Sequence, residues 1–222
     1  MALEGGWGKV SLGRDYVAGY TEVQIAPDPF IHTGVSSLVS VGTGGIGTVR
    51  NDGAITYKHQ LGAFGFALQT ASAVNPNSTT LPAPGTLDRP VNGYLSYQAG
   101  PVYIGWSHEN PGGANDNWNF IAARYVIDRW TLSTGLGSGK DNTSHERKSA
   151  MVGAAFKTAS GRIKLSYGQL KNNTTGTDLT KKMAIGYNHD LSKRTFVYAN
   201  LAHDKAAATH KNGFDVGLQH NF

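Results

Sequence analysis

Apolar and polar side chains alternate one by one along almost the whole chain, and this period of two restricts the fold more than any other feature. In the final segment, Phe214, Val216 and Leu218 share one parity, and Asp215 lies on the other. Successive side chains of a β-strand point to opposite faces, so each such segment has one apolar and one polar or small face. The longest apolar run, residues 61–68, is far shorter than the roughly 18 residues of a membrane-spanning helix, which excludes a helical membrane protein.

Twelve strands follow from this alternation, and no linker divides them, so the sequence predicts a single all-β domain over residues 1–222. Their connections alternate between short turns and long loops rich in Gly, Asn, Thr and Pro. This arrangement is typical of bacterial outer-membrane barrels, and we predict a closed antiparallel transmembrane β-barrel. Loop 17–48, after the first strand, is too long for an ordinary hairpin and is a candidate functional loop. The predicted strands are 7–16, 49–58, 63–71, 91–98, 102–108, 117–126, 130–138, 146–157, 162–169, 180–189, 194–202 and 212–222.

A soluble β-sandwich alternates in the same way, and the positions of the aromatic residues distinguish the two folds. In a membrane barrel the apolar face meets lipid, and aromatic side chains gather where the strands reach the headgroups. Aromatic residues of the apolar parity lie here beside the short turns or at the chain end. The pattern favours the barrel, the bacterial outer membrane as its location and outer-membrane lipid as its partner. This predicted girdle contains Tyr57, Phe64, Tyr97, Tyr125, Trp130, Phe156, Tyr187 and Phe222.

The opposite parity, which would face the lumen, is rich in small residues and carries more basic than acidic ones. Small side chains leave room for water, and twelve strands enclose a lumen wider than that of the small, filled barrels. Fixed cations in a narrow lumen raise the local concentration of anions, so we predict a passive channel for small hydrophilic solutes and ions that prefers anions. Arg162, Lys182 and Arg194 lie close to turns or loops and fit a solvated rim equally well. The cations predicted to line the pore are Arg50, Lys58, Arg124 and Arg147.

Other functional classes lack the residues that they require. The chain has no cysteine, which excludes thiol catalysis and Cys-ligated zinc, and its eight histidines form no metal-binding pair. A phospholipase-type barrel would need a Ser–His pair on the lipid face; His108 and His189 have that parity, but no Ser is positioned with them. The cations are spread over many strands, which argues against a nucleic-acid partner. We expect no enzyme, no cofactor and no metal.

Five motifs occur in a defined order over essentially the whole chain. The first two are GKVSLGRDY at 8–16 and Asp-Pro-Phe at 28–30, and the next strand contains VRNDGAITY at 49–57. The last two are YNHDLSKRT at 187–195 and GLQHNF at 217–222. In this order and spacing the motifs resemble those of the Gram-negative general porins, especially the β-proteobacterial type. The resemblance implies that loop 17–48 folds into the barrel and narrows the pore, and that the barrel-assembly machinery reads Phe222.

The resemblance also implies roles for single residues. Arg14 would lie on the pore wall with Arg50 beside it, and both would face Glu22 or Asp28 on the inward loop. The alternation instead sets Arg14 on the lipid side. Either a β-bulge re-aims this side chain at the end of its strand, or the role does not carry over.

The family's barrel has about sixteen strands, and the chain resembles the last twelve, so about four would precede Gly8. We expect either a smaller barrel, natural or designed, or a fragment that does not close. The resemblance implies a homotrimer, although the unmatched strands would supply much of its contact. The alternative to an open channel is an outer-membrane barrel with a blocked lumen and a structural or specific-uptake role, in which the inward loop plugs a narrower barrel.

Overall fold

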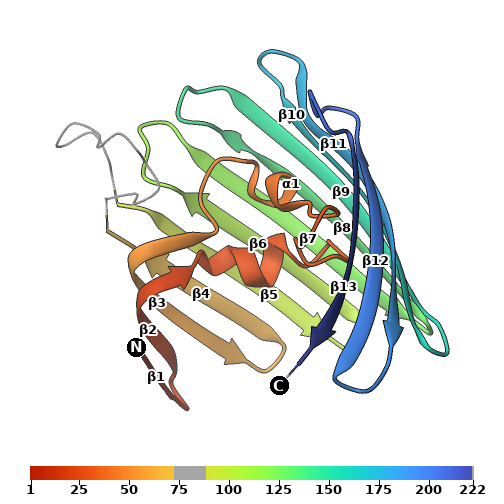
Figure 1. The fold of residues 1–222 in the computed structure, drawn as a ribbon. Helices are drawn as coiled ribbons and strands as arrows, with labels where there is room; N and C mark the ends of the chain where they lie inside the picture. Colours follow the sequence, from red (N-terminus) through yellow and green to blue (C-terminus); the bar gives the residue numbers. More distant parts are fainter. Residues whose placement is uncertain (73–88, 222) are drawn as a thin grey trace.

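The computed structural model describes residues 1–72 and 89–221 and shows one curved antiparallel sheet with a long loop inside its curve (Figure 1). Each strand is hydrogen-bonded to its neighbours in the chain, as predicted for an all-β antiparallel fold. The described residues form thirteen strands: β1 (Ala2–Gly5), β2 (Gly8–Tyr16), β3 (Arg50–Leu61), β4 (Phe64–Thr70), β5 (Val91–Ala99), β6 (Val102–Asn110), β7 (Asn117–Ile127), β8 (Trp130–Lys140), β9 (Glu146–Lys157), β10 (Gly161–Asn172), β11 (Thr177–Asp190), β12 (Thr195–Asp204) and β13 (Asn212–His220).

Strand β1 is one more than the sequence predicts. Its four residues pair with the start of β2, from Ala2 opposite Ser11 to Gly5 opposite Gly8. A segment this short shows too little alternation to be detected by its period. The twelve predicted strands correspond to β2–β13, so the predicted count is one short for the described residues.

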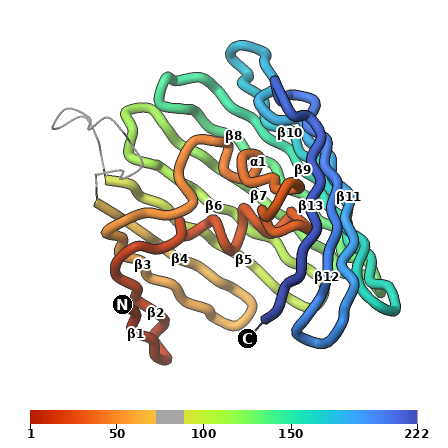
Figure 2. Tube along the Cα trace, in the orientation of Figure 1, coloured from red at the N-terminus to blue at the C-terminus, as the bar shows by residue number. Residues whose placement is uncertain are grey.

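The sheet is open in this structure. Among the described residues, β1 pairs only with β2 and β13 only with β12, and the tube view shows both as the outer edges of the curved sheet (Figure 2). Curvature and antiparallel pairing agree with the expected barrel, but closure of the barrel remains a prediction. Within the described residues, no helix is both long and apolar enough to cross a membrane.

The two faces of the sheet differ as the alternation predicts. On the outer face, large apolar side chains are exposed along the strands; Leu68 is 65% exposed and Leu136 is 61% exposed. Residues of the opposite parity are buried or small, as at Ala122 and Gly135. An exposed apolar surface that extends over many strands marks a face that meets lipid or a partner.

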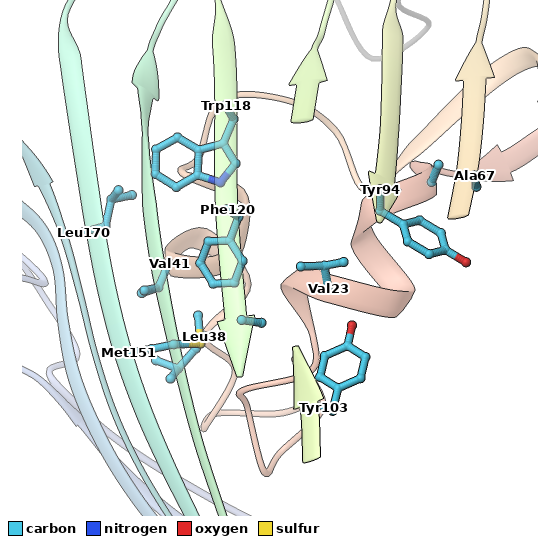
Figure 3. Packing of buried hydrophobic residues seen from close by; sticks show 12 residues of the cluster. Val23, Leu38, Val41, Ala67, Tyr94, Tyr103, Trp118, Phe120, Met151 and Leu170 are labelled. Atoms are coloured by element: carbon cyan, nitrogen blue, oxygen red, sulfur yellow. The ribbon is translucent and has the colours of Figure 1, made fainter. Parts of the chain in front are cut away.

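Loop 17–48 lies against the inner face and supplies four of the twelve buried residues of the main hydrophobic cluster. It contains a short π-helical segment, Tyr20–Gln24, and the helix α1, Val39–Thr43. In Figures 1 and 2 the loop, drawn in red and orange, crosses the concave side of the sheet. Its apolar side chains pack on inward side chains of the wall (Figure 3). The main members of this cluster are Val23, Leu38 and Val41 from the loop and Tyr94, Tyr103, Trp118, Phe120, Met151 and Leu170 from the strands.

Candidate functional site

The space between loop 17–48 and the inner face of the sheet is the candidate site. A cavity of about 490 Å³ lies there, on the side of the loop that carries Glu22 and Asp28. A smaller cavity of about 180 Å³ lies beside β2 and β3 and includes Lys58 in its lining. The wall of the larger cavity is polar, with Gln60, Ser96, Gln98, Arg124, Thr131, Ser133 and Arg162 among its residues.

Lys58 and Glu22, both predicted at the pore, form an ion pair between β3 and the loop. The Lys58 Nζ donates to a Glu22 carboxylate oxygen, and it lies 5.9 Å from the centre of the Tyr94 ring. The Tyr103 hydroxyl donates to the backbone carbonyl of Glu22. The loop is thereby held to β3 and β6, and the charge of Lys58 is balanced inside the site.

Asp28 organises the loop itself. One of its carboxylate oxygens accepts the N–H of Phe30 at 2.9 Å; the other accepts those of His32 at 3.0 Å and Leu38 at 3.3 Å. Only 4% of the residue is exposed. Burial raises the pKa of Asp28, and these three donors oppose the rise. The inward side chain of Lys164 is also largely buried, and its Nζ lies 4.5 Å from the centre of the Phe30 ring.

Arg147 fastens the end of α1 to the wall. Its Nη1 donates to the carbonyls of Gly44 at 3.1 Å and Gly45 at 2.9 Å, and its Nη2 lies 3.0 Å from Asp141 Oδ2. Burial works against ionisation of Asp141, but hydrogen bonds from the Thr143 hydroxyl, from backbone N–H groups and from Arg147 outweigh it and lower the pKa of Asp141 to about 2. The charge of Arg147 is therefore balanced, and this residue acts as an anchor of the loop.

Arg14 and Arg50 contact neither Glu22 nor Asp28 in the described hydrogen bonds and ion pairs. The Arg50 guanidinium lies over the Tyr16 ring, 4.0 Å from its centre, and donates to the hydroxyl of the same residue. The Arg14 Nε lies 3.3 Å from Asp52 Oδ1, and its side chain is 61% exposed.

A β-bulge does occur beside Arg14. The register between β2 and β3 shifts between Gly13 and Asp15, and the extra residue lies on β3, where Gly53 has a φ of +59°. A bulge with glycine in the left-handed region is a regular way to add one residue to a strand. The bulge therefore gives Arg14 a partner on β3, at Asp52, rather than on the loop.

Arg124 and Arg162 remain on the cavity wall without an acidic partner among the described ion pairs. The Arg124 guanidinium lies 5.1 Å from the centre of the Tyr103 ring and 3.4 Å from Gln98 Oε1. Arg162 lies directly opposite Lys157 across β9 and β10, so two cations adjoin there. The sequence left Arg162 undecided between wall and rim, and the structure places it in the lining of the cavity.

The polar wall residues Gln60, Ser96 and Gln98 were not singled out from the sequence. Their signal is their parity, because each alternates with an outward apolar residue on β3 or β5. Side-chain amides and hydroxyls can replace part of the hydration shell of a passing solute, and guanidinium groups attract anions. The arrangement therefore suits the passage of small hydrophilic anions past the loop.

Most residues of the predicted girdle lie close to the short turns between strands, and these turns are at the lower end of the sheet in Figure 1. The Trp130 and Phe156 rings lie 4.7 Å apart, and those of Phe64 and Tyr97 lie 5.1 Å apart. The exposed members include Tyr97, Tyr125, Trp130 and Tyr187, whereas Tyr57 is partly covered and donates to the carbonyl of Trp7. Phe222 lies outside the described residues.

Comparisons with known proteins give the family. The family model of the Gram-negative porins matches residues 1–209. Outer membrane porin protein 32 of Delftia acidovorans is 26% identical over 243 residues, covering 99% of this chain and 65% of the relative, so the chain spans about two thirds of that protein's length.

Solved structures share the fold. The anion-selective porin from Comamonas acidovorans superposes with a TM-score of 0.81 at 24% identity, covering 100% of this chain and 76% of that one. The OmpF porin of Salmonella typhi, in complex with daunomycin, superposes with a TM-score of 0.75 at 16% identity, covering 97% and 74%. At these identities the likeness establishes the architecture alone. The family match, which extends over most of the sequence, shows that the chain belongs to the Gram-negative porins and that its location is the bacterial outer membrane.

Proposed function

We propose that the chain forms the wall of a water-filled channel through which small hydrophilic solutes and ions diffuse passively, with a preference for anions. The observation that carries the proposal is the cavity between the loop and the inner face, with Arg124 and Arg162 on its wall and no acid paired with either in the described ion pairs. Lys58 and Arg147 are each balanced by a carboxylate. On the wall of the larger cavity, the unbalanced positive charge therefore lies at Arg124 and Arg162.

The channel requires a closed wall. Each unpaired backbone N–H or C=O at a strand edge costs several kcal/mol in hydrocarbon, so the edges at β1 and β13 are unfavourable in a bilayer. Neighbouring strands alternate in direction, which means that β1 and β13 run the same way. A fully antiparallel closed wall needs an even number of strands, and we propose that the closed barrel has such an even number. Folded and boiled samples should migrate differently on a gel; identical migration would argue against a closed barrel.

Anion preference also has support from a relative, since one protein of the same fold is described as an anion-selective porin. The measurement is the reversal potential of the refolded protein in a planar lipid bilayer, with a KCl gradient across it. An anion-preferring channel gives a reversal potential with the same sign as the equilibrium potential of chloride. A potential of the opposite sign would overturn the preference, even if the channel itself were open.

A blocked lumen is the second candidate, and the packing of the loop favours it. Val23, Leu38 and Val41 belong to the same buried cluster as Trp118 and Phe120, so apolar side chains occupy part of the space inside the curve. Single-channel recordings separate the two functions. Stepwise openings support the channel, and silence from protein that passes the gel test supports the blocked barrel.

A homotrimer is the assembly that we propose. One solved structure of this fold is the trimer form of OmpT of Vibrio cholerae. Chemical crosslinking of the folded protein in detergent should yield a species of three chains. A product that stops at one chain, at protein concentrations where the sample conducts, would contradict the trimer. Recognition of Phe222 by the assembly machinery stays a prediction from the sequence.

A further inference from the structure

The larger cavity has an apolar side as well as a basic one. Its wall residues are mostly polar, and they include Arg124 on β7 and Arg162 on β10. The loop contributes the apolar side with Ile25, Pro29 and Ile31. A preference for anions explains the guanidinium groups, but it gives no reason for apolar side chains at the same cavity. A volume of about 490 Å³ is enough for a small organic molecule that contacts both sides.

Ile31 is the most unusual of these apolar residues. It is 62% exposed, and its φ of +56° lies in the left-handed region. In the part of the chain that the structure describes, no other β-branched residue has a φ in this region. The conformation is unfavourable because the branched side chain crowds the backbone, and exposure of the side chain to water is unfavourable as well. Backbone strain of this kind is concentrated at functional sites.

The turn that contains Ile31 is fixed around this residue. The Ile31 N–H donates to the carbonyl of Asp28 at 3.0 Å. The Asp28 carboxylate accepts the N–H groups of Phe30 and His32. Phe30 is buried beside Gly186 of β11, where an added Cβ would lie 2.7 Å from Phe30 Cε1. Because its neighbours are held in this way, Ile31 stays at the cavity rather than in the core.

The acids at this cavity do not cancel the charge of the two arginines. Glu22 pairs with Lys58, and Asp28 is buried with its carboxylate bonded to backbone N–H groups. Arg124 and Arg162 pair with no acid in the described ion pairs. A carboxylate is an anion that a guanidinium group can bind with two parallel hydrogen bonds. The cavity therefore offers cationic groups for a carboxylate and, on the loop, an apolar surface for the rest of the same molecule.

We propose that this cavity selects carboxylates with an apolar body, such as an aromatic ring or a branched alkyl group. The carboxylate binds to the guanidinium groups of Arg124 and Arg162, and the apolar body lies against Ile25, Pro29 and Ile31. This substrate class rests on the proposed channel, because it names the solutes that the channel favours. Binding itself does not require conduction, so the site and the channel can be tested separately.

Fluorine NMR of the folded protein in detergent measures the binding, with 4-fluorobenzoate as the probe and protein-free detergent as the blank. 4-Fluorobenzamide has the same ring without the charge, and fluoroacetate has the charge without the ring. Burial of about 40 Å² of apolar surface contributes about fivefold in affinity, and a partly exposed ion pair contributes up to about as much. Both reference molecules should therefore bind about fivefold more weakly than 4-fluorobenzoate.

Ile31→Asn separates a role in binding from a role in folding. Asparagine adopts left-handed backbone angles more readily than isoleucine, so the turn should be at least as stable in I31N as in the wild type. Binding of 4-fluorobenzoate should nevertheless fall about fivefold. The matched control is L191N, which replaces an exposed leucine in the turn between β11 and β12 and should bind the probe as the wild type does.

A double variant tests the basic side of the cavity. R124Q/R162Q should bind 4-fluorobenzoate at least about fivefold more weakly, because no guanidinium group of the pair remains. The charge-matched control R14Q/R129Q replaces two exposed arginines outside the lining of this cavity and should bind as the wild type does. Different migration of unboiled and boiled samples on a gel verifies that each variant is folded.

The proposal is overturned if either reference molecule binds as tightly as 4-fluorobenzoate, or if I31N or R124Q/R162Q binds the probe as its control does. Reversal potentials and single-channel currents then address conduction. Protein that binds the probe selectively but never conducts supports the site and refutes the channel. Protein that conducts chloride but does not distinguish the three molecules refutes the site and leaves the channel in place.

Discussion

Replacing Arg124 by glutamine removes one of the two unbalanced charges on the cavity wall and keeps a polar side chain of similar reach. Arg124 is held by the Tyr103 ring and the Gln98 amide, and it forms no described ion pair. Glutamine can still donate to Gln98, so the fold of the wall should persist. The expected consequence is a change in ion selectivity with little change in stability.

Coulomb's law gives the size of the effect. For an ion that passes about 6 Å from the guanidinium in water, one unit charge changes its energy by about 0.7 kcal/mol, and about 0.1 M salt roughly halves that value. The local anion concentration then falls about two- to threefold in the variant, and the cation concentration rises by the same factor. The ratio of anion to cation permeability should therefore decrease about four- to tenfold.

Reversal potentials in a KCl gradient measure this ratio. Arg14→Gln is the matched control, because Arg14 is exposed and pairs with Asp52 away from the lining of the larger cavity. We expect R14Q to change the ratio less than about twofold, since salt screens exposed charges at a distance. The reasoning fails if R14Q shifts selectivity as much as R124Q does, or if R124Q leaves the ratio unchanged.

Three further predictions concern the attachment of the loop. Trp118→Phe removes the 2.8 Å hydrogen bond from Trp118 Nε1 to the carbonyl of Gly42 and should lower the free energy of unfolding by about 1–3 kcal/mol. The control W106F, on the outer face, should change this free energy little. Equal melting temperatures of W118F and W106F would refute the prediction. Burial lowers the pKa of His32 to about 4, so the folded loop holds this imidazole neutral and loses stability as the pH falls from about 6.5 to about 4. Proteolysis of the loop should therefore increase over that pH interval in the wild type but not in H32Q. Because the pKa of Asp141 is lowered to about 2, the contribution of its carboxylate to stability is complete above about pH 4 and disappears only as the pH falls through about 2. D141N should therefore loosen α1 at neutral pH, because Arg147 loses its ionic partner while it holds Gly44. Unchanged protease resistance of the loop would contradict the role of Arg147 as an anchor.

The alternation of side chains predicted the strands and the two faces with few errors. Strands β2–β13 correspond to the twelve predicted segments because alternation is a local property that each strand carries alone. The same parity placed Arg124 inward and Tyr125 outward, and the structure has them so. Strand β1 was missed because four residues contain too little of the period to recognise it.

Contacts between residues far apart in the chain were decided by the tertiary structure alone. Parity assigns a side chain to a face, but it does not say how high on the wall a loop residue docks. Glu22 meets Lys58 rather than Arg50, and Arg147 meets Gly44 and Gly45, because the course of the loop depends on how its apolar residues pack against Trp118 and its neighbours. Which cations keep an unbalanced charge depends on all of these contacts together. The chain's order of residues therefore determined its strands, its faces and its excess of inward positive charge, while the folded loop decided where that charge remains.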